Sequence, residues 1–288
     1  MDHLKEAPDY LQDDHLSRGT KAYLKVLNGG APVESLPVGE ARRVLTDVQA
    51  AVHVDLSGIE ESERTVESGG GWVLGDYPTH RRLVRDLVVE SGCAAVFVNY
   101  TPSPEAHFPK AVEEVYAAVK WVAENGREIG VDGSRLALAG NSVEDHGGPR
   151  LRTLVLMWPV TDAGYDWDSY VKYGRQRFLT APLMKWMFGK YVSDPAQRGN
   201  DLMSPVRASA ERLRGLPATL IVVAENDILR DEGEAMGRRL DEAGVEVTTV
   251  RFNGVVHDWG MLNGFAALHP TRTLIRLVGS VLRDYLEK

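Results

Sequence analysis

A serine follows a short apolar segment at a position where its hydroxyl could act as a nucleophile. Residues 136–143, LALAGNSV, predict an apolar strand that runs into a Gly-Asn-Ser turn. Glycine relieves backbone crowding in a sharp turn, so Gly140 suits a turn that presents the Ser142 hydroxyl at the edge of a sheet. A serine hydroxyl in that place attacks carbonyl carbons once a neighbouring base takes its proton. We therefore predict Ser142 as the nucleophile, with an ordinary turn serine as the alternative.

Carboxylates end a second apolar segment. Residues 222–234, VVAENDILRDEGE, predict a strand that ends near Asp227 and is followed by a helix. A carboxylate at the carboxyl end of a strand is well placed to orient a histidine. Glu225 and Asp231 lie close by in the sequence, and an acid here could instead cap the helix, where acids are favoured. The residues alone leave these alternatives open.

A histidine follows the next predicted strand. His257 lies in FNGVVHDWG, residues 252–260, directly after the strand and before the last helix. Of the eight histidines, it alone follows an acid-bearing strand in a loop that can reach the carboxyl edge of the sheet. Such a histidine can act as a general base, whereas the plain alternative is a surface loop. His80 and His146 become candidates only if the fold differs, and His269 before a proline is typical of a turn.

A glycine run lies earlier in the chain. Residues 68–76, SGGGWVLGD, predict a loop before a helix. Glycines let backbone N–H groups approach a ligand closely, so this loop could donate to a developing oxyanion. Glycine runs also make flexible loops, and the pattern is weak on its own.

The elements that would position these residues alternate along the chain. The patterns predict strands at 93–100, 135–140, 153–158, 219–224 and 246–251, and helices at 79–91, 110–125, 231–243 and 271–286. Alternation of this kind predicts a mostly parallel sheet covered by helices on both faces, an α/β fold.

Two regions stand outside that alternation. Residues 1–60 have helical spacing and no strand pattern, and residues 164–200 are dense in aromatic side chains. We expect one domain over residues 1–288, with a helical cap at 1–60 and a cap insertion at 164–200. The aromatic side chains could line an acyl pocket or form an extra packed layer.

Composition excludes several classes of protein. With 43% apolar and 26% charged residues the 288-residue chain is typical of a soluble globular protein. Its net charge of −8 argues against nucleic acid or an anionic membrane as a partner. The single cysteine, Cys93, is expected to be a buried structural thiol. The acidic start has no apolar leader segment, which favours a cytoplasmic protein. No histidine or cysteine cluster predicts a metal site.

Taken in order, the motifs resemble those of the bacterial hormone-sensitive-lipase-like carboxylesterases. That family carries H-G-G-G-W, D-Y-x-x-x-P-E-x-x-F-P and G-D-S-A-G-G in this order. The first motif is matched by Gly69, Gly70, Gly71 and Trp72, and the second by Tyr100, Pro104, Glu105, Phe108 and Pro109. The resemblance spans residues 68–288 and implies an α/β-hydrolase fold with a helical cap.

The resemblance also implies roles for single residues. It assigns the acid of a Ser-His-Asp triad to Asp227, in preference to Glu225 and Asp231, and the base to His257. The chain order Ser142, Asp227, His257 is that of α/β-hydrolases. The backbone N–H groups of Gly69, Gly70 and Val143 would form the oxyanion hole. The implied activity is hydrolysis of small acyl esters without a cofactor, in a protein that could form a homodimer.

The chain departs from the family pattern in two places. Ser68 replaces the leading histidine of the first motif, the apolar strand expected before it is missing, and Glu144 replaces the glycine after the nucleophile. Only ten residues separate Ser142 from the next strand at Thr153, which leaves no room for a helix of useful length. We interpret both places as deletions of internal segments. The alternative function is therefore a catalytically impaired or inactive hydrolase-like scaffold; a carboxylate-nucleophile chemistry is disfavoured because Ser142 stands at the turn.

Overall fold

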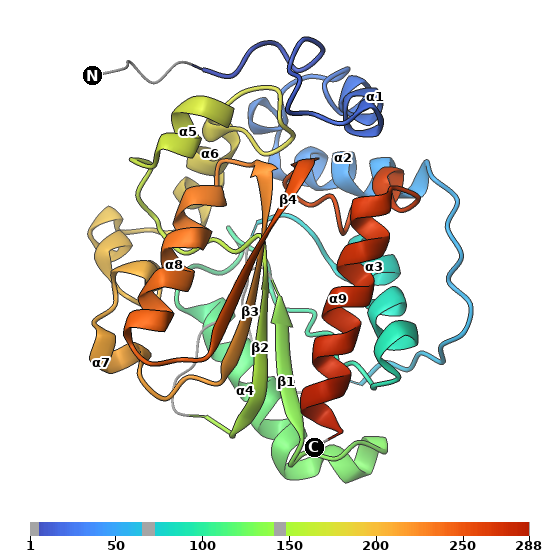
Figure 1. Cartoon of the computed structure of the whole chain (residues 1–288), viewed down its shortest axis with the longest axis vertical. Helices are drawn as coiled ribbons and strands as arrows, with labels where there is room; N and C mark the ends of the chain where they lie inside the picture. The colour runs from blue at the N-terminus through green and yellow to red at the C-terminus, as the bar shows by residue number, and fades with distance from the viewer. Residues whose placement is uncertain (1–5, 65–72, 141–147, 288) are drawn as a thin grey trace.

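A parallel sheet forms the centre of the protein. The structure is a computed structural model that describes residues 6–64, 73–140 and 148–287. In these residues the sheet has four strands, β1 (Leu136–Gly140), β2 (Leu151–Met157), β3 (Ala218–Asn226) and β4 (Val247–Val256), in the spatial order β1-β2-β3-β4. Each neighbouring pair is parallel, so every carboxyl end lies at the same edge (Figure 1). This confirms the predicted α/β fold.

Helices cover both faces of the sheet because alternate strand residues point to opposite sides. Val155 and Val222 pack toward α9 (His269–Leu286), whereas the adjacent Leu156 and Val223 pack toward α8 (Arg230–Glu242). Figure 1 shows α8 on one side and α9 with α3 (Tyr77–Ser91) on the other. The predicted helices at 79–91, 110–125, 231–243 and 271–286 all form, that at 110–125 as α4 (Lys110–Asn125).

Two helices near the start of the chain lie over the carboxyl edge of the sheet. They are α1 (Arg18–Leu27) and α2 (Val38–Ala50) (Figure 1). The chain just before α1 makes one isolated parallel bridge, between Leu16 and Gly254 at the end of β4. The buried side chain of Gln49 donates to the carbonyls of Thr79 and Met261, which ties α2 to the body of the protein.

The aromatic-rich stretch folds as short helices between β2 and β3. It contains α5 (Asp168–Tyr173) and α6 (Ala181–Tyr191), and α7 (Ala210–Leu213) follows before β3. Short 3₁₀ turns occur at Val33–Ser35, Gly126–Ile129, Pro195–Gly199, Pro205–Arg207 and Asn263–Phe265. The side chains of Tyr170, Tyr173 and Phe188 are buried together with Ile228 and Leu229, the residues that follow Asp227. The stretch therefore packs on the loop that carries the candidate acid.

One predicted strand does not form. Residues 93–100 are described, yet they follow α3 as a chain without strand pairing. A strand requires a hydrogen-bonded neighbour, and a cavity separates this segment from β1. The apolar pattern of residues 93–100 indicates strand propensity, but pairing depends on what lies alongside. Cys93 accordingly lies partly exposed, contrary to the predicted burial.

Within the described ranges, no helix is both long and apolar enough to cross a membrane.

Candidate active site

The register of two adjacent strands brings the candidate acid and base together. Asn226 at the end of β3 pairs with Val256 at the end of β4. The next residue of each strand is therefore delivered to the same point at the carboxyl edge of the sheet. The Nδ1 atom of His257 lies 2.8 Å from Oδ2 of Asp227 there, and both residues are buried. This is the distance of a charge-assisted hydrogen bond.

Asp227 is held by more than the histidine. Its second oxygen, Oδ1, accepts a hydrogen bond of 3.0 Å from the backbone N–H of Leu229. The carboxylate thus bridges the loop before α8 and the imidazole, while α8 itself begins at Arg230 without a side-chain cap. Asp227 therefore does not cap α8, the alternative role that the sequence left open.

The competing acids have other partners. Glu225 lies 2.9 Å from His15 and accepts from the backbone N–H of Gly254. Asp231 accepts from the backbone N–H of Ser169 and pairs with Arg230. Asp227 is the acid that meets His257, as the family resemblance implied.

Charge and burial act in opposite directions on the imidazole. Burial lowers the pKa of His257, but the negative charges of Asp227 and Asp258 outweigh it and raise that pKa to about 9. Asp258 Oδ1 lies 3.6 Å from Nε2, on the side of the ring opposite Asp227. The sequence analysis did not identify Asp258 as a residue of the site. The signal available in the sequence was its position directly after His257.

A tryptophan borders the histidine. Trp158 follows β2 and meets the His257 ring edge to face, with centroids 6.4 Å apart. It is buried, and its φ of 43° is in the left-handed region that few non-glycine residues adopt. The backbone strain at the end of β2 therefore coincides with an aromatic wall beside the candidate base.

The other candidates of the triad and oxyanion hole lie outside the described residues. These are Ser142, Val143, Gly69 and Gly70. The described part of β1 ends at Gly140, at the same edge as Asp227 and His257.

The alternative histidines are placed differently. His80 lies in the first turn of α3, where its Nδ1 is 2.9 Å from the carbonyl oxygen of Asp76. His269 begins α9 and is not a turn residue. His146 lies outside the described residues.

An ion pair that sequence reasoning missed joins the second motif to α2. The guanidinium of Arg42 binds both carboxylate oxygens of Glu105, at 2.8 and 2.7 Å. It also donates to the carbonyls of Ser103 and Val73. The Arg42 hydrogen bond lowers the pKa of Glu105 to about 2. Arg42 therefore connects α2 to Val73 and to residues 103–105, a contact between segments too distant in sequence to be foreseen.

An Asp-His pair at the carboxyl edge of a parallel sheet is an arrangement found in α/β-hydrolases, and comparison with known proteins gives the same class. Residues 68–261 match the family model described as alpha/beta hydrolase fold. The chain belongs to this family, and the resemblance to carboxylesterases is confirmed by the relatives it has.

Several of those relatives are named esterases. An arylesterase of Saccharolobus solfataricus is 30% identical over 86% of this chain and 84% of its own. An ethyl acetate hydrolase of Pseudomonas putida is 33% identical over 66% of this chain and 64% of its own. A solved thermostable esterase from Pseudomonas putida is 46% identical, with a TM-score of 0.92 over 95% of this chain and 98% of the other. By family, the chain is a serine hydrolase of the carboxylesterase type.

Proposed function

We propose that this protein hydrolyses esters of small carboxylic acids through an acyl-enzyme formed on Ser142, with His257 as the base and Asp227 as the orienting acid. The 2.8 Å bond between Asp227 and His257 carries the proposal. A buried carboxylate on Nδ1 selects the imidazole tautomer whose Nε2 is free to accept a proton. Asp258 Oδ1 lies 3.6 Å from Nε2, beyond hydrogen-bond distance, so Nε2 can take the proton of a nucleophile.

Each step of the proposed reaction uses a named group. Nε2 of His257 takes the Ser142 proton as the serine oxygen attacks the ester carbonyl. The oxyanion of the tetrahedral intermediate accepts hydrogen bonds from the backbone of Gly69, Gly70 and Val143. The imidazolium then protonates the departing alkoxide, which leaves as an alcohol. Water, deprotonated by the same imidazole, attacks the acyl-enzyme and releases the acid and the free serine.

The cap regions support a small acyl group as substrate. The helices α1 and α2 and the aromatic stretch lie over the edge where β3 and β4 end (Figure 1). We propose that residues 1–60 and 164–200 together cap the site in one domain and that their aromatic side chains limit the length of the acyl chain. The similarity to a protein named ethyl acetate hydrolase is consistent with short esters.

The test is hydrolysis of p-nitrophenyl acetate. Ser142→Ala is expected to lower kcat by at least about 10³-fold, because no other group can form the acyl-enzyme. Ser134→Ala, a change at an exposed serine before β1, serves as the matched control and is expected to leave kcat unchanged. A rate that is the same in all three proteins would reject the assignment.

Covalent labelling separates a working enzyme from the scaffold alternative. A fluorophosphonate probe is expected to label the native protein and to leave Ser142→Ala unlabelled, because the probe reacts only with an activated serine. If the folded native protein is not labelled, the result would instead support the inactive hydrolase-like scaffold.

A further inference from the structure

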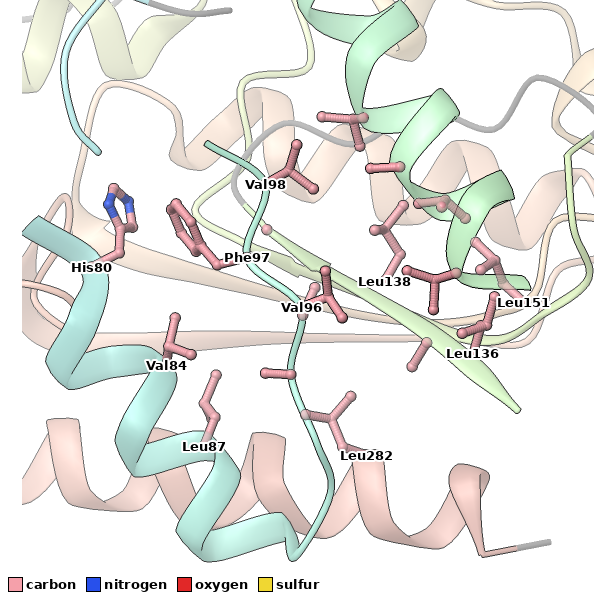
Figure 2. A pocket seen from close by; sticks show the side chains of 18 of the residues that line it. His80, Val84, Leu87, Val96, Phe97, Val98, Leu136, Leu138, Leu151 and Leu282 are labelled. Atoms are coloured by element: carbon pink, nitrogen blue, oxygen red, sulfur yellow. The ribbon is translucent and has the colours of Figure 1, made fainter. Parts of the chain in front are cut away.

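An apolar cavity lies between β1 and the segment of residues 93–100. Its volume is about 1060 Å³. Figure 2 shows Val96 and Val98 on one side and Leu136 and Leu138 of β1 on the other. The remaining walls come from α3, α4 and α9, including Val84, Leu87, Val122 and Leu282. The cavity thus lies next to β1, on the side of that strand away from β2, where a further strand of the sheet would lie.

Two opposite walls of the cavity carry backbone groups that have no backbone partner among the residues that the structure describes. Within the described residues, β1 pairs with β2 along one edge and has no strand on the other. Residues 93–98 likewise make no backbone-to-backbone hydrogen bond to any other described residue. Unpaired N–H and C=O groups beside an apolar cavity are costly, and a free strand edge is a template for another strand.

We propose that this cavity is a binding site for one extended peptide strand, which pairs with β1 and fills the space up to residues 93–100. A strand supplies hydrogen-bonding groups on two sides and side chains on two faces, as these walls require. A small apolar molecule would fill the volume but leave both rows of backbone groups unpaired. Because helices border both faces, the bound strand is a continuous run of aliphatic residues.

The charged residues at one end of the cavity determine which residues can flank the aliphatic run of that peptide. The C-terminal ends of α3 and α9 meet there, where Arg283 donates to the carbonyl of Ser91 at 3.3 Å. Glu90, Glu287 and Asp132 line this end, and Asp132 is paired with Arg135. Arg135 and Arg283 also line this end, but with Asp132 the three carboxylates outnumber the two guanidiniums by one, and this excess negative charge favours a cation.

The direction of the peptide follows from the sheet. This end is also where β1 begins, since Arg135 just before it donates to the carbonyl of Leu286. A strand parallel to β1, like every other strand described, starts at this end. The site therefore takes a peptide in which lysines precede about six aliphatic residues, the usual length of a strand.

The experiment uses the whole protein and a synthetic probe, Lys-Lys-Val-Ile-Val-Val-Ile-Val-amide. Hydrogen exchange read by mass spectrometry is expected to show slower exchange of the amides at 94–98 and 136–140 when the peptide is bound. The melting temperature is expected to rise with peptide concentration, because the peptide binds only the folded chain. Neither readout depends on ester hydrolysis.

Two altered peptides distinguish binding as a paired strand from nonspecific binding of an apolar ligand. N-methylation of alternate residues removes the N–H groups of one edge, and this peptide is expected to bind at least about tenfold more weakly. The same composition with its lysines at the carboxyl end is also expected to bind about tenfold more weakly, because the charges then face away from Glu90 and Glu287.

A protein variant tests the location. Val96 is 50% exposed, so Val96→Lys is compatible with folding while placing an ammonium in the path of the strand. It is expected to weaken peptide binding at least about tenfold. Val171→Lys, at a valine on α5 that is 49% exposed and outside the cavity, is the matched control and is expected to bind normally. No protection at about 1 mM peptide, or equal binding of the N-methylated peptide, would overturn the proposal.

Discussion

The Nδ1 atom of His257 and the Oδ2 atom of Asp227 lie 2.8 Å apart at the ends of two neighbouring parallel strands. The second carboxylate oxygen is held by the backbone N–H of Leu229, so the acid cannot turn away from the ring without losing that bond. The pair is buried, which strengthens the electrostatic part of the interaction. The predictions below depend on this relationship and on the contacts that attach the N-terminal segment and α1.

Asp227→Asn tests the role of the carboxylate. The amide keeps the shape of the side chain but no longer stabilises the imidazolium or selects the productive tautomer. We expect kcat for p-nitrophenyl acetate to fall on the order of 10⁴-fold with little change in KM. Glu225→Gln, at a carboxylate two residues earlier, is the control and is expected to keep most of the activity. Equal losses in both variants would contradict a special role for Asp227.

The pH dependence of the rate tests the environment of His257. The neutral imidazole is the form that accepts the serine proton, and the pKa of His257 is raised to about 9. We therefore expect kcat/KM to increase with pH throughout the neutral range, to pass half of its maximum near pH 9 and to level off above it. A plateau that already begins at pH 7 would contradict this expectation.

The variant Asp258→Asn tests whether the charge of Asp258 contributes to this pH profile. It removes one of the two negative charges that raise the pKa of His257. Asparagine also tolerates the φ of 60° at this position. The rising limb of the profile is expected to move to lower pH, and NMR titration of His257 is expected to show the same shift.

The same protonation contributes to stability with a defined sign. The folded pKa of about 9 lies above the ordinary histidine value of 6.5, so the folded state binds the proton more tightly. The resulting stabilisation is fully present below pH 6.5 and is lost as pH rises through 9. Urea denaturation of the native protein and of His257→Gln between pH 6 and 10 measures it, and parallel curves for the two proteins would exclude the effect.

A buried ion pair attaches the N-terminal segment. Arg177 Nη2 lies 2.7 Å from Oδ2 of Asp13, and both side chains are almost fully buried. Asp13→Ala leaves the guanidinium buried without its counter-charge, and we expect the free energy of unfolding to decrease by about 3–5 kcal/mol. The exposed pair of Glu6 and Arg175 is the control. Glu6→Ala is expected to cost less than about 1 kcal/mol in the same urea titration.

An aromatic contact attaches α1. Phe265 is fully buried and meets the ring of Tyr23 edge to face at 4.9 Å. Phe265→Ala removes this contact and leaves a cavity, so the free energy of unfolding is expected to decrease by about 3–5 kcal/mol. Val26→Ala, at a 63% exposed position of α1, is expected to change it by less than about 0.5 kcal/mol. Similar losses in both variants would mean that α1 is not anchored through Phe265.

The sequence by itself determined which residues are candidates and what class of fold holds them. Asp227 and His257 each follow an apolar strand, and local periodicity together with the order of the motifs is enough to identify such positions. The helices at 79–91 and 110–125 were equally predictable. The first carries its capping signals, Asp76 ahead of it and Gly92 after it, in its own sequence.

Only the tertiary structure decided which of these residues meet. The bond between Asp227 and His257 depends on the register that pairs Asn226 with Val256, and register is a property of two strands together. The ion pair of Arg42 with Glu105 joins segments that no local pattern relates. Residues 93–100 have the composition of a strand, but a strand is completed by a neighbour. The cavity beside β1 is therefore a result of long-range packing, which no local pattern of residues contains.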